Sequence, residues 1–424
     1  MRIAVHDYAG HPFQFELSRS LARLGHEVRH FYFAGDAGPK GQTTRLPDDP
    51  ETFSIAPVSI PMRYSKTRYV YRAVADLLYG RVAARAIRRF RPEVVISGNT
   101  PLDSQAAIQA AAHSVGAGFV FWVQDFYSVA IQHLVAQKGS AFRRLMATHY
   151  RNLETRMLRR SDSIVLISED FRRYLPPGVD GTRPIHVVPN WGPIEAISPG
   201  AKRNPWAEAN GFADRFTFLY TGTLALKHNP GLLWDLARSF KDDPDLRVGV
   251  VSAGVGTDLL RARLAEEPLD NLVLLPQQPM SVFPDVLASA DVLIAVLEDD
   301  AGEFSVPSKV LSYLCAGRPI LLAAPSENLS SRIVTEAGAG VQVRAGDVDA
   351  FREAALRFRR DHALREQAGA AGRAYAEKHF VVEDIARRFE RILEQSRHPH
   401  RRSTLRSLFT RRSRPLGQAG AQEV

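Results

Sequence analysis

Residues 216–237 of the chain read FTFLYTGTLALKHNPGLLWDLA, and this stretch decides the fold. The apolar run Phe216–Tyr220 has the length and aromatic content of a buried strand in a parallel sheet. A turn at Gly222 follows. A helical apolar period then starts after Asn229-Pro230, an N-cap residue with proline at the first helical position. This order predicts a strand–turn–helix unit of an α/β domain.

The same connection has the features of a phosphate site. Gly222 lets backbone N–H groups approach an anion, the helix start adds partial positive charge, and Lys227 adds a full charge. The alternative is an ordinary connection between a strand and a helix. A second lysine-bearing loop, at residues 303–309, favours the phosphate site.

Length and composition limit the class of protein. A chain of 424 residues with 45% hydrophobic residues is long enough for two domains. No apolar run approaches the roughly 20 residues that span a bilayer, and the start MRIAVHDYAG lacks a signal-peptide pattern. Cys315, the single cysteine, excludes internal disulfides and a multi-cysteine metal site. We therefore expect a cytoplasmic protein without a bound metal.

The net charge of +9 favours an anionic partner. Residues 63–91 are rich in arginine, contain one acid, Asp76, and repeat apolar residues at helical spacing. This pattern is typical of a membrane-surface helix; the alternative is a core-packed helix with a solvated arginine face. Residues 397–414 form a second basic block, expected to be disordered and to contact anionic lipid. No nucleic-acid recognition motif or aromatic stacking platform is present, so nucleic acid is not expected.

The first half of the chain opens with a strand, a turn at Gly10-His11, a helix over Phe13–Leu24 and a second strand. This order is typical of a doubly wound α/β domain. A G-x-G-x-x-G fingerprint is missing, which disfavours a dehydrogenase. Residues 35–61 are expected to form a loop. Asp125 follows the predicted strand Phe119–Val123, at the edge where open α/β sheets bind ligands, although it could equally cap the next helix.

The alternation of strands and helices restarts at residue 216, which predicts two Rossmann-like domains facing across a cleft. Ser308 is expected to cap a helix over Lys309–Ala316. We expect an N-terminal domain over 1–190, a linker over 191–215, a C-terminal domain over 216–380, a helix over 381–396 that returns towards the N-terminal domain, and a basic tail over 397–424.

Several motifs occur in a familiar order. They are HPFQFELSRSLARLGHEV, WVQDFY, LETRMLRRSDSIVLISEDF and VVPNW in the first half, and TGTLALKHNPGLL, SAGVG, LLPQQP, ASADVLIAVL and VPSKVLSYLCAGRPIL in the second. With them the chain, over roughly residues 1–395, resembles the retaining GT-B glycosyltransferases of family 4. The similarity is greatest to the bacterial polysaccharide enzymes of the colanic-acid and O-antigen type.

The resemblance implies a glycosyltransferase that moves a sugar from a nucleotide diphosphate-sugar to a saccharide in surface polysaccharide biosynthesis, with retention of configuration. A lipid-linked acceptor at the inner face of the cytoplasmic membrane is expected, with no cofactor besides the donor substrate. In such enzymes the leaving phosphate accepts the acceptor's proton, so no protein base is required. The C-terminal domain would hold the donor and the N-terminal domain the acceptor.

The resemblance also assigns roles to residues. Lys227 would stabilise the leaving diphosphate, and Asp125 lies beside the position, here Gln124, where many members carry a histidine near the sugar. These two residues are the expected catalytic pair. Donor contacts are implied for the following residues: Gly10, His11, Gly222, Thr223, Gln277, Glu303, Phe304, Ser305, Ser308, Lys309 and Ser312.

The chain departs from the family pattern at two places. Thr223 stands where many members carry an arginine. Ser312 stands where many carry the second of two glutamates eight apart, and a serine cannot chelate two ribose hydroxyls as a carboxylate can. Lys309 would supply part of the missing positive charge. Two alternatives therefore stay open: a catalytically silent GT-B protein that binds a nucleotide sugar or a partner, and a sugar-nucleotide epimerase of similar layout.

Overall fold

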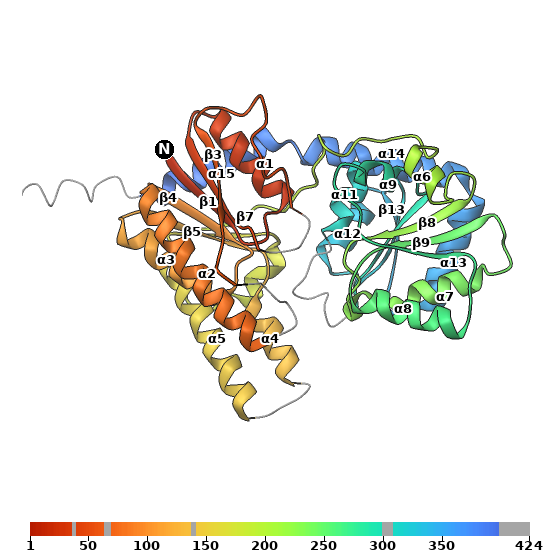
Figure 1. Cartoon of the computed structure of the whole chain (residues 1–424), viewed down its shortest axis with the longest axis horizontal. Helices are drawn as coiled ribbons and strands as arrows, with labels where there is room; N and C mark the ends of the chain where they lie inside the picture. The colour runs from red at the N-terminus through yellow and green to blue at the C-terminus, as the bar shows by residue number, and fades with distance from the viewer. Residues whose placement is uncertain (36–39, 63–68, 137–140, 299–307, 398–424) are drawn as a thin grey trace, which may run out of the picture.

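The computed structural model describes residues 1–35, 40–62, 69–136, 141–298 and 308–397. Two α/β lobes lie side by side, each built around a parallel sheet (Figure 1). The first sheet has the strand order β3-β2-β1-β4-β5-β6-β7, and the second has the order β10-β9-β8-β11-β12-β13. The predicted fold class, two Rossmann-like domains, is confirmed.

In the N-terminal lobe, β1 lies between β2 and β4, so the chain reverses its direction of travel across the sheet there. Loops at such a reversal separate and leave room for a ligand at the carboxyl ends of the strands. The lobe consists of β1 (Arg2–Asp7), α1 (Pro12–Arg23), β2 (Glu27–Phe33), β3 (Phe53–Val58), α2 (Tyr69–Phe90), β4 (Val94–Gly98), α3 (Leu102–Ser114), β5 (Gly118–Val123), α4 (Tyr127–Ala136), α5 (Ala141–Arg160), β6 (Ser163–Leu166), the 3-10 helix η1 (Glu169–Tyr174) and β7 (Ile185–Val187).

In the C-terminal lobe, the stretch that opened the sequence analysis forms the centre of the sheet. All six residues of β8 are buried, and Asn229 caps α7 by accepting the Leu232 N–H at 3.1 Å, as predicted. The elements are α6 (Pro205–Ala209), β8 (Phe216–Thr221), η2 (Leu226–His228), α7 (Pro230–Ser239), β9 (Leu246–Val251), α8 (Val255–Glu266), β10 (Leu272–Leu275), α9 (Phe283–Ala288), β11 (Val292–Val296), α11 (Lys309–Cys315), β12 (Ile320–Ala323), α12 (Leu329–Glu336), β13 (Gly340–Val343), α13 (Val348–Arg360) and α14 (His362–His379).

Two predictions of local structure are wrong. Residues 53–58 were expected in a loop but form β3, at the edge of the first sheet. Pro57 is tolerated there because an edge strand needs backbone donors on one side only. Ser308 does not cap α11: its backbone is already helical and its side chain makes no capping hydrogen bond. A capping serine needs an extended backbone to turn its hydroxyl towards the helix.

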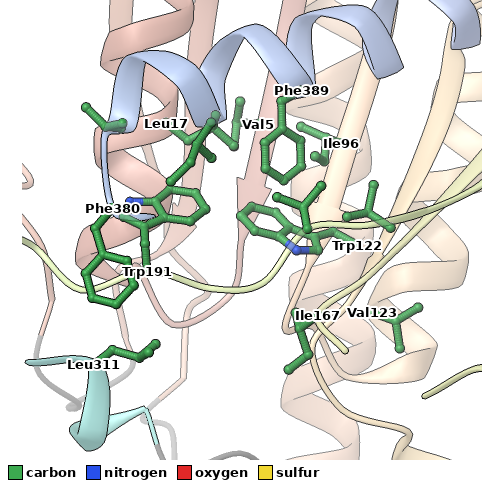
Figure 2. Close-up of a cluster of buried hydrophobic side chains, with 14 of the residues drawn as sticks. Val5, Leu17, Ile96, Trp122, Val123, Ile167, Trp191, Leu311, Phe380 and Phe389 are labelled. Carbon is green, nitrogen blue, oxygen red and sulfur yellow. The ribbon is translucent and has the colours of Figure 1, made fainter. Parts of the chain in front are cut away.

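An aromatic cluster joins the lobes. Helix α15 (Val382–Ser396) leaves the C-terminal lobe and packs on α1 and β5 of the N-terminal lobe. Figure 2 shows Trp191 of the connecting segment near Trp122 of β5 and Phe389 of α15. The two indoles stack with centroids 6.1 Å apart, and Phe389 lies 4.7 Å from Trp122. Away from this cluster, Arg332 of α12 forms an ion pair with Asp170 of η1.

None of the helices in the described ranges is long and apolar enough to cross a bilayer. The basic helix predicted within residues 63–91 is α2, and residues 63–68 lie outside the described residues. Its inner face is buried at Ala75, Tyr79 and Ala83, whereas its outer face is exposed.

Candidate functional site

The loop after β8 carries the predicted phosphate-site residues of the C-terminal lobe. Gly222 has a φ of +93°, a left-handed conformation that favours glycine, and its carbonyl accepts the Ser252 hydroxyl at 2.6 Å. Lys227 lies on η2 and is exposed. Its backbone carbonyl accepts the Glu298 N–H at 2.9 Å, which ties η2 to the end of β11.

Lys309, the first residue of α11, brings its side chain to the turn at Gly222. Its Nζ is enclosed and has no hydrogen-bond partner among the described residues. The ammonium lies over the Tyr220 ring, 3.5 Å from the centroid, and a Cβ on Gly222 would lie 4.0 Å from Nζ. Burial, reinforced by the charge of Lys227, lowers the pKa of Lys309 well below its usual range.

The charges of both lysines act on His228. Burial first, and then the charges of Lys309 and Lys227, lower the pKa of His228 to about 3, against a raising contribution from its hydrogen bond to Thr223. The imidazole is therefore neutral near pH 7. Its Nδ1 accepts the Ala225 N–H at 3.1 Å. The two lysine amines, and not the imidazole, are therefore the groups of this region that would pair with an anion.

In the N-terminal lobe, Asp7 at the end of β1 is fully buried. Its carboxylate accepts the backbone N–H groups of Ala9 and His11, and the His11 Nδ1 lies 3.2 Å from both carboxylate oxygens. Burial raises the pKa of Asp7, but the charge and hydrogen bonds of His11, with the charge of His30, outweigh it and lower the pKa overall. Asn99 Nδ2 lies 3.2 Å from the same ring nitrogen. The His11 ring is thus oriented by a carboxylate and an amide.

Asp125 lies two residues after the end of β5 and is partly exposed. Burial raises the pKa of Asp125 to about 6, against the lowering effect of Lys227 and then of His11. The charge of Lys227 in the C-terminal lobe and that of His11 in the N-terminal lobe therefore both act on the Asp125 carboxyl group. These three predicted residues come together between the lobes.

Two interactions clamp the Asp125 loop. The Gln124 and Asn190 side-chain amides bond reciprocally, at 2.6 and 3.2 Å. The buried Glu154 carboxylate accepts the N–H groups of Tyr127 and Ser128 at the start of α4. These N–H groups are the ones a capping residue serves, so Glu154 supplies the bonds that the alternative interpretation gave to Asp125.

The other predicted donor-site residues divide into three groups. Gly10, with a φ of +76°, lies beside His11 at the start of α1, and Gln277 Nε2 donates weakly to the Thr223 hydroxyl at 3.4 Å. Ser308 is exposed and Ser312 is partly buried on α11, one turn beyond Lys309. The remaining residues, Glu303, Phe304 and Ser305, lie outside the described residues.

Sequence reasoning missed several members of this region: Asp7, Asn99, Glu154, Asn190, Tyr220 and His228. Asp7 is the last residue of β1 and Asn99 follows β4 directly, so the rule that singled out Asp125, a position at the carboxyl end of a strand, would have found both. Tyr220 lies inside an apolar strand, and no sequence signal separates it from the core. Among the described residues, no group of three His, Cys, Asp or Glu side chains is arranged to hold a metal ion.

Part of the chain matches a known protein family. Residues 12–191 match the model of the glycosyl transferase 4-like domain. A search of curated protein sequences finds no match.

The fold is similar to that of several solved glycosyltransferases. Sucrose-phosphate synthase from Thermosynechococcus elongatus superposes with a TM-score of 0.71 at 15% identity, covering 97% of this chain and 99% of that chain. Anabaena HepE in complex with UDP-glucose gives a TM-score of 0.66 at 12% identity, with 93% and 99% covered. WaaG, a glycosyltransferase involved in lipopolysaccharide biosynthesis, gives 0.61 at 17% identity, with 91% and 98% covered. These likenesses establish the GT-B fold, and together with the domain match they support a glycosyltransferase.

Proposed function

We propose that the chain transfers a sugar from a nucleotide diphosphate-sugar to a saccharide acceptor, with retention of configuration. One observation carries the proposal: Lys227 and Lys309 bring two amine groups to the end of β8, and the charge of Lys227 acts on Asp125 of the other lobe. A diphosphate matches the cations, and the carboxylate lies on the side from which an acceptor would approach. HepE, a neighbour in fold, is described in complex with UDP-glucose.

In this proposal Lys227 contacts the diphosphate and stabilises the charge that grows on it as the glycosidic bond breaks. The positive φ of Gly222 favours glycine, and glycine leaves the space beside the turn free of a side chain. Thr223 and Gln277, joined by their hydrogen bond, lie beside this turn and would contact the nucleotide part. The leaving phosphate oxygen then takes the proton of the acceptor hydroxyl.

Asp125 is proposed to lie beside the sugar. At neutral pH its carboxylate is ionised, because its pKa of about 6 lies below the pH. A carboxylate there would stabilise the positive charge that develops on the anomeric carbon, or accept a hydrogen bond from a sugar hydroxyl. Asp7 and Asn99 would act as positioning residues by holding the His11 ring.

We also propose that the acceptor is lipid-linked and that α2 contacts an anionic membrane surface, as part of surface polysaccharide biosynthesis. The outer face of α2 exposes Tyr71, Val74 and Leu77 in its first half and arginines at 81, 85, 88 and 89 in its second half. Apolar side chains beside arginines match an anionic bilayer surface. The basic block over 397–414 lies almost entirely outside the described residues. Co-sedimentation with phosphatidylglycerol vesicles, compared with phosphatidylcholine vesicles, tests this part.

A catalytically silent nucleotide-sugar-binding protein remains the second candidate, and Thr223 and Ser312 are the observations that favour it. A transfer assay separates the two. Wild-type protein with UDP-, GDP- and TDP-sugars and extracted glycolipid should release nucleoside diphosphate. The Lys227→Ala variant should lose about 10²- to 10³-fold in kcat/KM, the effect of removing one charge-stabilising group. The exposed surface variant Lys241→Ala is the control. Donor binding without any turnover would instead support the silent protein.

A further inference from the structure

The surroundings of Lys309 have a consequence for donor binding. The amine is enclosed and, among the described residues, has no hydrogen-bond partner and one favourable contact, the Tyr220 ring centroid 3.5 Å from Nζ. A ring face compensates only part of the hydration that an ammonium loses on burial. A lysine in such surroundings lacks hydrogen-bond acceptors until an anion binds beside it.

The described groups around Lys309 do not supply that anion. The charges that act on it come from Lys227, and His228 beside it is neutral near pH 7 because its pKa is about 3. Tyr220 and Tyr313 on the adjoining strand and on α11 are also neutral, since burial raises the pKa of Tyr220 well above 10 and that of Tyr313 to about 12. Among the described residues, no carboxylate contributes to the electrostatic surroundings of Lys309.

The position of Lys309 relative to Gly222 shows where the anion would enter. A Cβ on Gly222 would lie 3.8 Å from Cε and 4.0 Å from Nζ, so the ammonium lies directly beside the space that the missing side chain leaves open. Lys309 therefore brings a cation to the same turn from a different element.

We propose that Lys309 is a second diphosphate-binding residue, which becomes a charged and paired ammonium only when the donor arrives, so that donor binding takes up one proton. This inference rests on the proposed function. The proton passes from the buffer to Nζ, and the new N–H⁺ groups donate to diphosphate oxygens. The lowered pKa of the free protein supports this order of events. Tyr220 acts as a positioning residue that holds the amine under the turn.

Isothermal titration calorimetry of the full chain at pH 8 tests the proposal. A nucleotide diphosphate-sugar carries no group that titrates near pH 8, so a dependence of the binding enthalpy on the buffer's ionisation enthalpy reports protons bound by the protein. With the sugar nucleotide that binds wild-type protein, we expect net proton uptake. The affinity should fall as pH rises above the lowered pKa of Lys309.

Lys309→Met is the matched variant, because it keeps the length of the side chain and removes the amine. It should abolish the proton uptake and weaken binding roughly 10- to 100-fold, the effect of losing a charge-assisted hydrogen bond. It should also raise the Tm of the free protein, since an unpaired buried amine is replaced by an apolar group. Lys241→Met on the surface should change neither quantity.

The outcomes separate the two proposals. If no nucleotide sugar binds the wild-type protein, the proposed function fails and the role of Lys309 fails with it. If wild-type protein binds without proton uptake, or if Lys309→Met binds within twofold of wild type, the role of Lys309 is wrong while the proposed function stands.

Discussion

The Asp7 carboxylate in the N-terminal lobe and the Lys309 amine in the C-terminal lobe are both enclosed, but only the Asp7 group has hydrogen-bond partners among the described residues. Asp7 accepts two backbone N–H groups and contacts the His11 ring, so its charged form is stabilised in the free protein. Lys309 has a tyrosine ring and no hydrogen-bond partner within the described part of the chain. Both pKa values are lowered, which favours the charged form of the acid and the neutral form of the amine.

The difference indicates that the two lobes prepare for a ligand in different ways. The N-terminal loops are organised before any ligand binds, because their polar groups satisfy one another. The C-terminal site is left short of negative charge, and the missing charge is what the proposed donor would bring. If the proposed function holds, an organised N-terminal site and a C-terminal site short of negative charge predict that the donor binds before the acceptor.

Asp7→Asn should have the largest effect on folding stability. The amide keeps one acceptor but turns an N–H donor towards the donors that now bond to the carboxylate, so the free energy of unfolding should fall by about 2–4 kcal/mol. Urea denaturation of the variant and of the exposed control Asp242→Asn measures this. A loss below that of the control would mean that the Asp7 contacts contribute little.

The same comparison has a pH dependence with a definite sign. The pKa of Asp7 is lowered from its usual value of 3.8, so its contribution to stability is present above pH 3.8 and is lost as pH falls through the lowered value. The stability difference between wild type and Asp7→Asn should therefore be largest near pH 7 and shrink in acid. A difference that grows as pH falls would contradict this account.

Asp125→Asn tests the group that faces Lys227. The pKa of Asp125 is raised to about 6, so the carboxyl group is protonated below pH 6 and ionised above it. We expect kcat/KM of the wild type to rise with pH through about 6 and then level off. The variant should lose roughly 10- to 100-fold at pH 7.5 and lack this acid limb. An acid limb that persists in the variant would assign the titration to another group.

Gly222→Ala tests the turn above Lys309. At a φ of +93° an alanine is strained by about 1–2 kcal/mol, and its methyl group would lie 3.8 Å from Lys309 Cε. We expect a lower Tm and weaker donor binding, both measured by thermal shift with and without the sugar nucleotide. Gly211→Ala, at a φ of +76° with no atom within 4 Å of the added Cβ, is the control for strain alone. Equal loss of donor affinity in both variants would remove the role of the Gly222 turn.

The smallest effect is expected at the ion pair between Asp170 and Arg332, which connects η1 and α12 away from the aromatic cluster. Both side chains are more than a third exposed, so Asp170→Asn should cost about 0.5 kcal/mol or less, and less still at high salt. Thermal unfolding at 50 mM and 500 mM NaCl checks this. A larger loss that is insensitive to salt would show that the pair fixes the lobes together.

The fold was predictable because the strands of parallel sheets are continuous apolar runs closed by glycine turns. The stretch at residues 216–237 is the best example: its strand, its turn and its Asn229 cap all appear as predicted. The strand at 53–58 was not predicted from the sequence, because Pro57 was interpreted as a strand breaker, whereas an edge position tolerates it. Whether a strand lies at the edge or in the centre depends on the whole sheet, and a local sequence pattern does not carry this information.

Parts of the candidate site were predictable from the ends of strands: Gly222 follows β8 directly, and Asp125 lies two residues after β5. Glu154 and Asn190 act through the Asp125 loop from distant elements, and only the fold brings them there. The surroundings of Lys309 were equally hidden. Its position in the sequence predicts a lysine near the donor, but its contact with Tyr220 and its lack of a partner depend on how α11 packs against β8.

The most direct test of the central claim is the affinity of the full chain for a panel of UDP-, GDP- and TDP-sugars, measured by calorimetry for wild type, Lys227→Ala, Lys309→Met and the control Lys241→Met. We predict that at least one sugar nucleotide binds wild type and Lys241→Met equally and binds both site variants at least tenfold more weakly. Equal affinity in all four proteins, or no binding to any of them, would contradict the assignment of the donor diphosphate to this pair of lysines.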